Sequence, residues 1–222
     1  MRIMIHAAPA RMWYVRDFLV PALTGQGIEK ADIELWIDGK GKGNLTACME
    51  AFASLRDVPG GTWHLQDDVI PAHDFAVRAA VHDEGVVAGY CCQHVDQWLA
   101  YRGRQPPMFL WYSFPCIRIP NELAADCADW FFRDARFRPK YRPWVLAKKF
   151  DDSFFLAYLQ ERRGNIRVEN LVPCLVDHVD YLIGGSLVNG DRPRKIYRAA
   201  LWEDDETVAA LEKALKDHPK TR

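Results

Sequence analysis

The chain has 222 residues, of which 49% are hydrophobic and 27% are charged, a composition typical of a soluble globular protein with one large domain or two small ones. A formal net charge of −1 gives no overall attraction to nucleic acid or membranes, although it is compatible with a local basic patch. No segment reaches the roughly 18 apolar residues of a membrane span, and the start, MRIMIHAAPARMW, lacks the apolar stretch of a signal peptide.

Strands and helices alternate through the first half of the chain. Apolar residues recur at helical spacing in 12–24, where Pro21 marks a kink or a boundary. The glycine-rich loop 39–44 leads into an amphipathic segment for which Asn44 is the predicted N-cap. The elements predicted in this half are strands at 2–7, 32–37, 62–65 and 86–92 and helices at 12–24, 45–55 and 74–83.

The second half is less regular. An apolar run with strand character surrounds Pro115, and the basic, proline-containing segment 133–148 is predicted to be an exposed loop. Five cations interleave with aromatic residues in 133–144, a pattern that suits either a solvated loop or a nucleic-acid backbone with a stacked base. The other elements predicted here are an apolar run at 108–119, helices at 122–132, 152–162 and 204–216, a strand at 166–169 and a basic segment at 192–198.

The alternation predicts an α/β fold with a central, mostly parallel sheet flanked by helices. Ligands bind beyond the carboxyl ends of the strands in such sheets. Three segments follow predicted strands in this way: Ala8–Arg11, Asp38–Asn44 and Gln66–Asp68. We therefore expect a ligand site where these three segments meet.

The cysteines indicate a reducing compartment. None of the six forms a C-x-x-C pair, and four lie in apolar runs typical of buried thiols. With no signal peptide, this predicts a cytoplasmic protein, in a cell or in a virus-infected cell. The cysteines are Cys48, Cys91, Cys92, Cys116, Cys127 and Cys174.

Two adjacent carboxylates, Asp67 and Asp68, end the predicted strand in 62-TWHLQDDVIP-71. Because like charges repel, the pair needs a counter-charge, and hard oxygen ligands suit Mg²⁺ or Mn²⁺. Such a cation usually completes its coordination with phosphate oxygens, which implies a diphosphate substrate. The alternative is a solvated acidic turn.

Other residues extend this hypothesis. His178 lies between Asp177 and Asp180, and a neutral imidazole is a good ligand for manganese, although a lone histidine is more often structural. Gly184 and Gly185 would let backbone N–H groups approach a phosphate. The cations available for phosphate are Lys40, Lys42, Arg192, Arg194, Lys195 and Arg198.

A second acidic pair, Asp151 and Asp152, opens the predicted helix 152–162. One interpretation is an N-cap with acids in the first turn, which the helix dipole stabilises. The other is a general base that takes a proton from an incoming hydroxyl. Both can hold for one residue, because the cap fixes its position.

The order of these motifs resembles that of nucleotide-sugar glycosyltransferases of the GT-A type. HLQDDVIP is similar to the L-E-D-D-V of glycosyltransferases related to the bacterial lipopolysaccharide and collagen galactosyltransferases, and PCLVDHVDYLIGGS has close counterparts in small glycosyltransferases of bacteriophages. The resemblance covers residues 3–200. It implies a single GT-A-like (Rossmann-like) domain over 1–222, with a nucleotide-binding half at 1–100, an acceptor half and metal-closing segment at 101–200, and a C-terminal helix at 201–222.

The resemblance also implies site residues. Asp68 and His178 would bind Mn²⁺ or Mg²⁺, and Asp152, next to Asp151, would be the catalytic base of an inverting enzyme. Gln66 stands where the family has an acid, which keeps a hydrogen-bond acceptor but loses a charge. The residues implied for nucleotide-sugar binding are Ala8, Pro9, Arg11, Asp38, Gly43, Asn44, Gln66, Asp67, Asp68, Ser186, Arg194 and Lys195.

The implied reaction is transfer of a sugar from a nucleoside-diphosphate sugar, such as a UDP-sugar, to an acceptor hydroxyl. The acceptor would be a surface glycan or, for a phage protein in an infected bacterium, a modified DNA base. Two alternatives remain open at this point: a metal-dependent nucleotidyltransferase or phosphohydrolase that uses Asp67, Asp68 and His178, and a non-catalytic nucleotide-sugar-binding protein, for which Gln66 is the only indication.

Overall fold

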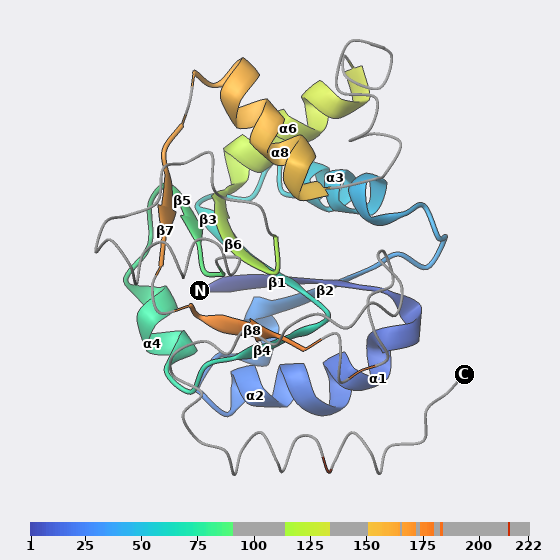
Figure 1. The fold of residues 1–222 in the computed structure, drawn as a ribbon, viewed down its shortest axis with the longest axis vertical. Coiled ribbons are helices and arrows are strands. Elements are labelled where there is room, and N and C mark those ends of the chain that lie inside the picture. Colours follow the sequence, from blue (N-terminus) through green and yellow to red (C-terminus); the bar gives the residue numbers. More distant parts are fainter. Residues whose placement is uncertain are drawn as a thin grey trace, which may run out of the picture.

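The protein is a three-layer α/β structure (Figure 1), described here from a computed structural model over residues 1–90, 114–133, 151–164, 166–171, 174–179, 183 and 213. Six strands form the main sheet in the order β2-β1-β3-β6-β5-β7. They are β1 (Arg2–Ala7), β2 (Ile33–Ile37), β3 (Gly61–Gln66), β5 (Val86–Ala88), β6 (Cys116–Pro120) and β7 (Val168–Asn170).

The sheet is mixed and mostly parallel, as the sequence predicts. β1 pairs in parallel with both β2 and β3, and β5 pairs in parallel with β7. Only β6 runs the other way, antiparallel to β3 and β5. Ile3, Met4 and Ile5 of β1 are fully buried, as expected of a central strand covered on both faces.

Helices cover both faces of the sheet. On one face lie α3 (Asn44–Ser54), α6 (Asn121–Arg133) and α8 (Asp151–Arg162), above the sheet in Figure 1. Leu45, Cys48, Met49 and Phe52 form the apolar stripe of α3 and belong to the core on this face. The opposite face is covered by α1 (Met12–Tyr14), η2 (Val15–Leu19), α2 (Val20–Thr24) and α4 (Phe75–Ala80).

A small second sheet lies on this opposite face (Figure 1). It pairs β4 (Val69–Pro71) with β8 (Val176–His178) in antiparallel register, so that Val69 faces His178. The chain thus turns at Asp67–Asp68 out of β3 into a separate sheet. The pairing brings a late segment of the chain beside the end of β3.

Several predicted boundaries shift. The predicted helix 12–24 contains a π-helical stretch, η2, directly before α2, because Pro21 has no N–H to give the carbonyl of Asp17. The prediction of Asn44 as N-cap is wrong by one residue: α3 begins at Asn44, and Gly43 precedes it with a φ of 87°, a conformation that favours glycine.

The shorter elements are η1 (Pro9–Arg11) and η3 (Lys30–Asp32). The predicted strand 86–92 is shorter in the structure, where β5 ends at Ala88, and its residues 91–92 lie outside the described residues. Most of the predicted helix 204–216 and of the basic segment 133–148 also lies outside them. Within the described part of the chain, no helix has the length and apolar character needed to cross a membrane.

Candidate active site

Three chain segments meet at the carboxyl edge of the parallel strands. The register places His6 beside Trp36 on one side and beside Gln66 on the other, so β1, β2 and β3 end at nearly the same level. Ala8, Asp38 and Asp67 therefore leave the sheet side by side. The sequence predicts this edge as the ligand site, and the fold brings the three segments together there.

The aspartate pair is bound by Arg11. Its Nη1 lies 2.9 Å from Asp67 Oδ1 and 2.6 Å from Asp68 Oδ2, and Asp67 Oδ2 accepts a 2.6 Å hydrogen bond from the backbone N–H of Ala8. The side chain of Arg11 is only 5% exposed. Arg11 is the last residue of η1, the short turn that follows β1. This position places its side chain beside the carboxylates.

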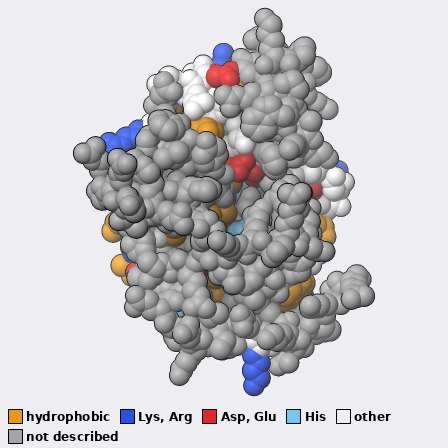
Figure 2. All heavy atoms as spheres, in the orientation of Figure 1, with side chains coloured by type: hydrophobic (Ala, Val, Ile, Leu, Met, Phe, Trp, Pro, Cys, Tyr) orange, Lys and Arg blue, Asp and Glu red, His pale blue; other side chains and the backbone are white. Residues whose placement is uncertain are grey.

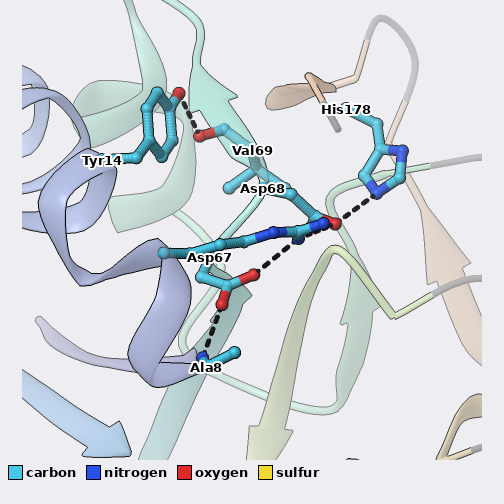
Figure 3. Close-up of polar contacts among 7 residues, drawn as sticks. Ala8, Tyr14, Asp67, Asp68, Val69 and His178 are labelled. Atoms are coloured by element: carbon cyan, nitrogen blue, oxygen red, sulfur yellow. Dashed lines mark hydrogen bonds and ion pairs between the residues drawn. The ribbon is translucent and has the colours of Figure 1, made fainter. Parts of the chain in front are cut away.

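His178 completes the cluster from the far side (Figure 3). Its Nε2 lies 3.1 Å from Asp68 Oδ2. The backbone fixes this approach, because Val69 pairs with His178 and the N–H of Val179 donates a 2.7 Å hydrogen bond to the carbonyl of Asp68. Tyr14 holds the other side of the turn, since its hydroxyl donates a 2.9 Å hydrogen bond to the carbonyl of Val69.

The two aspartates have opposite pKa shifts. Burial raises the pKa of Asp67 to about 6, and the charge of Asp68 adds to this effect. Burial would also raise the pKa of Asp68, but His178 and then Arg11 outweigh it and hold this pKa below its usual value. Asp68 is therefore the charged member of the pair, with its charge stabilised by Arg11 and by the contact with His178.

Asp68 also has a free ligand atom. Its Oδ1 is buried and has no hydrogen-bond partner, although buried carboxylate oxygens are almost always paired. One carboxylate oxygen and a neighbouring imidazole nitrogen form a donor set that suits Mn²⁺ or Mg²⁺, with phosphate oxygens and water as the remaining ligands. The residues therefore fit a divalent cation, although no cluster of three or more His, Cys, Asp or Glu ligands occurs among the described residues.

Asp151 and Asp152 lie in the first turn of α8 and cap its N–H groups. The N–H of Asp152 donates to Asp151 Oδ1 at 2.9 Å, and the N–H of Ser153 donates to Asp152 Oδ1 at 2.5 Å. Asp151 is buried, and burial together with the charge of Asp152 raises its pKa to about 7. Burial also raises the pKa of Asp152, which is half-buried. Both interpretations of the pair, cap and base, remain compatible with this geometry.

The acidic pair is placed by the start of α3. The side chain of Asn44 lowers the pKa of Asp151 and therefore lies near its carboxylate, and α3 begins just beyond the carboxyl end of β2. The pair therefore lies at the same edge of the sheet as the Asp67–Asp68 turn. Acidic atoms and histidine atoms are both visible near the middle of the face in Figure 2.

Asp38 has a local structural role that the sequence does not predict. Its Oδ1 accepts a 2.9 Å hydrogen bond from the N–H of Lys42, and its Oδ2 accepts one of 2.9 Å from the N–H of Gly43. Asp38 thus closes the glycine-rich loop and fixes the step that starts α3. The predicted contact of Asp38, Gly43 and Asn44 with base and ribose stays a prediction, as does that of Pro9 and Gln66.

Two features of this edge are missing from the sequence predictions. One is the binding of both aspartates by Arg11; the nucleotide-sugar binding that the resemblance implies for Arg11 stays a prediction. The other is a contact between the half-buried His6 and the fully buried His64, in which His6 Nε2 lies 2.9 Å from His64 Nδ1. Ser186, Arg194 and Lys195, predicted to bind the diphosphate, lie outside the described residues.

Comparisons with known proteins give a weak structural likeness and no sequence match. No protein-family model matches the chain, and no curated protein matches its sequence. Among solved structures, a galactosyltransferase, LgtC, in complex with donor and acceptor sugar analogues, is 12% identical and aligns over 99% of this chain and 98% of that chain with a TM-score of 0.43. Values this low support no argument about activity, and the α/β assignment therefore follows from the observed sheet topology.

Proposed function

We propose that the protein is a glycosyltransferase that moves a sugar from a nucleoside-diphosphate sugar, such as a UDP-sugar, to an acceptor hydroxyl. One observation carries the proposal: Asp68 and His178, which come from distant parts of the sequence, meet at 3.1 Å at the carboxyl edge of the parallel strands. A buried, unpartnered Asp68 Oδ1 beside them suits a cation that binds a diphosphate.

Asp68 and His178 would hold Mn²⁺ or Mg²⁺ in this proposal. When bound, the cation supplies positive charge that stabilises the diphosphate leaving group. The chain's own residues do the rest of the positioning: Asp38 fixes the glycine-rich loop through Lys42 and Gly43, and Arg194, Lys195 and Ser186 would bind the departing diphosphate.

Asp152 would be the general base, with Asp151 as its neighbour in the site. It takes the proton of the acceptor hydroxyl while that oxygen bonds to the anomeric carbon. The bond between the anomeric carbon and the diphosphate oxygen breaks, and its electron pair leaves with the nucleoside diphosphate. A raised pKa suits this role, because a base with a pKa near the working pH is the most efficient.

The proposal extends to the whole chain. Strands from residue 2 to residue 170 join one sheet, which supports a single domain over 1–222 rather than two separate ones. A cytoplasmic location is proposed from the reduced, buried cysteines Cys48, Cys116, Cys127 and Cys174. Either a glycan or a hydroxymethylated DNA base would be the acceptor.

The first experiment is a thermal-shift screen of nucleoside-diphosphate sugars with and without Mn²⁺. A donor at 100 times its dissociation constant adds about 2.7 kcal/mol of stability. We expect one donor to raise the melting temperature only with Mn²⁺, and Asp68→Asn to remove this gain. Asp129→Asn, a carboxylate change in the exposed pair with Arg56, should keep it.

The second experiment tests transfer with the donor found in the screen. Release of nucleoside diphosphate should depend on an acceptor, either a glycan or hydroxymethylated DNA, and Asp152→Asn should slow it about 10²- to 10⁴-fold with little change in donor binding. Release without any acceptor and unaffected by Asp152→Asn would instead identify a phosphohydrolase. No thermal response to any donor would contradict the proposal.

A further inference from the structure

Arg11 provides a positive charge beside the two carboxylates in the absence of a metal ion. Arg11 Nη1 lies within 3 Å of both Asp67 Oδ1 and Asp68 Oδ2. Two buried carboxylates on adjacent residues repel each other strongly in a site shielded from water. A single buried guanidinium between them offsets that repulsion and holds the turn between β3 and β4 closed.

A divalent cation would use the same carboxylate. Asp68 Oδ2 already contacts both Arg11 and His178, at 2.6 Å and 3.1 Å, and its other oxygen is the unpartnered Oδ1. A metal ion beside Asp68 therefore sits within a few ångströms of a guanidinium charge in a buried site. Two cations this close repel each other, and the repulsion is weakly screened by solvent.

We propose that Arg11 is an internal counter-cation that competes with the divalent cation for Asp68, so that the free protein binds metal weakly. The nucleoside diphosphate would supply the negative charge that permits Arg11 and the metal ion to occupy the site together. This proposal rests on the proposed function for the identity of the diphosphate, but the competition itself depends only on Arg11, Asp68 and His178.

The competition makes a directional prediction for the free protein. Removing the charge of Arg11 should tighten binding of Mn²⁺ alone, although it removes a buried ion pair and lowers stability without metal. A merely structural Arg11 predicts the opposite for binding, because a loosened turn would hold Asp68 and His178 less well. Metal affinity without donor therefore separates the two roles.

The test is a titration of Mn²⁺ into the full chain without donor, with free Mn²⁺ followed by its electron paramagnetic resonance signal. We expect Arg11→Gln to bind Mn²⁺ about tenfold or more tightly than the wild type, and Arg11→Lys, which keeps the charge, to stay close to the wild type. Arg16→Gln, which removes a cation from an exposed pair with Asp17, is the matched control and should change nothing. Adding Asp68→Asn to Arg11→Gln should abolish the gain.

Equal or weaker Mn²⁺ binding by Arg11→Gln overturns the proposal. If this variant unfolds without metal, refolding driven by Mn²⁺ and not by K⁺ supports the proposal, and failure to refold overturns it. Donor binding by the wild type is scored separately. Tighter Mn²⁺ binding by Arg11→Gln with no response of the wild type to any donor supports the competition and contradicts the transferase. A donor response of the wild type with unchanged Mn²⁺ affinity of Arg11→Gln supports the transferase and contradicts the competition.

Discussion

Burial opposes the ionisation of individual carboxyl groups in this site. Asp151 is buried beneath the start of α3 and has a pKa of about 7, raised by burial and by the charge of Asp152. A carboxyl group placed in this way costs stability, because the folded protein must ionise it in poor contact with solvent. Residues proposed for catalysis are often placed under this kind of strain.

Asp151→Asn should stabilise the protein more at pH 8 than at pH 5. The folded-state pKa of Asp151 lies above its value of about 3.9 in the unfolded chain, so the wild type loses stability as the pH rises through this window, up to about 7. The Asn variant has no such loss and keeps an oxygen for the N–H of Asp152. The difference in unfolding free energy between Asp151→Asn and the wild type should be about 2 kcal/mol larger at pH 8 than at pH 5, as measured by urea unfolding.

Asp129→Asn is the control for this measurement. Its carboxylate is exposed, and the hydrogen bond from Arg56 lowers its pKa, so its neutralisation should bring no gain at pH 8. An advantage of Asp151→Asn that is the same at pH 5 and pH 8 would contradict the placement of an ionisable group there.

The histidine pair gives a second pH prediction. Burial lowers the pKa of His6 to about 4 and that of His64 further below its usual value, with the charge of His6 adding to the effect on His64. The unfolded chain binds protons on these rings from about pH 6.5 downward, whereas the folded chain does not. Folding stability should therefore fall as the pH drops from about 6.5 towards 4.

His64→Leu should remove part of this acid sensitivity. The ring nitrogen Nε2 of His64 is buried without a partner, so an apolar side chain of similar size suits the site. Between pH 7.5 and pH 5, the variant should lose about 2 kcal/mol less than the wild type, as measured by urea unfolding. Equal losses for both proteins would contradict the prediction.

At the scale of elements, the order of strands and helices could be predicted, but not their pairing. The runs RIMIHA, DIELWI and TWHL identify three strands with polar residues after each, and β1, β2 and β3 follow them closely. Nothing local in VIP or VDH shows that β4 and β8 pair in a second sheet, because register across such a distance depends on tertiary packing. For the same reason, Arg11 could not be assigned to the aspartates from the sequence.

The β4–β8 pairing makes a prediction about the site. Val179→Pro removes the N–H that bonds to the carbonyl of Asp68 at 2.7 Å and should displace His178 from Asp68. We expect the Mn²⁺-dependent rise in melting temperature with donor to disappear. Val179→Ala keeps this N–H and loses only side-chain packing, so it should lower stability and retain the metal-dependent rise. Loss of the rise in both variants would show that packing, rather than the strand pair, places His178.

At the scale of the whole molecule, Gly89 connects the main sheet to the segment that carries His178. Its N–H donates to the carbonyl of Cys116 at 2.9 Å, and its carbonyl accepts from the N–H of Leu175 at 2.6 Å. The site thus depends on contacts between three distant parts of the chain. A small residue is required here, because the three parts approach one another closely.

Gly89→Ala should therefore destabilise the whole protein. The added Cβ would lie 2.5 Å from Cys116 Sγ and 3.1 Å from both Leu175 Cδ1 and Trp63 Cζ3, and overpacking of this kind costs about 1–3 kcal/mol. Gly39→Ala, with no atom within 4 Å of its new Cβ, should cost little. Since Cys116→Ala removes the closest of the three clashing atoms, the double variant should recover part of the loss relative to the sum of the single changes. If the changes in unfolding free energy of the two single variants simply add in the double variant, the contact with Cys116 Sγ is not the reason that position 89 requires glycine.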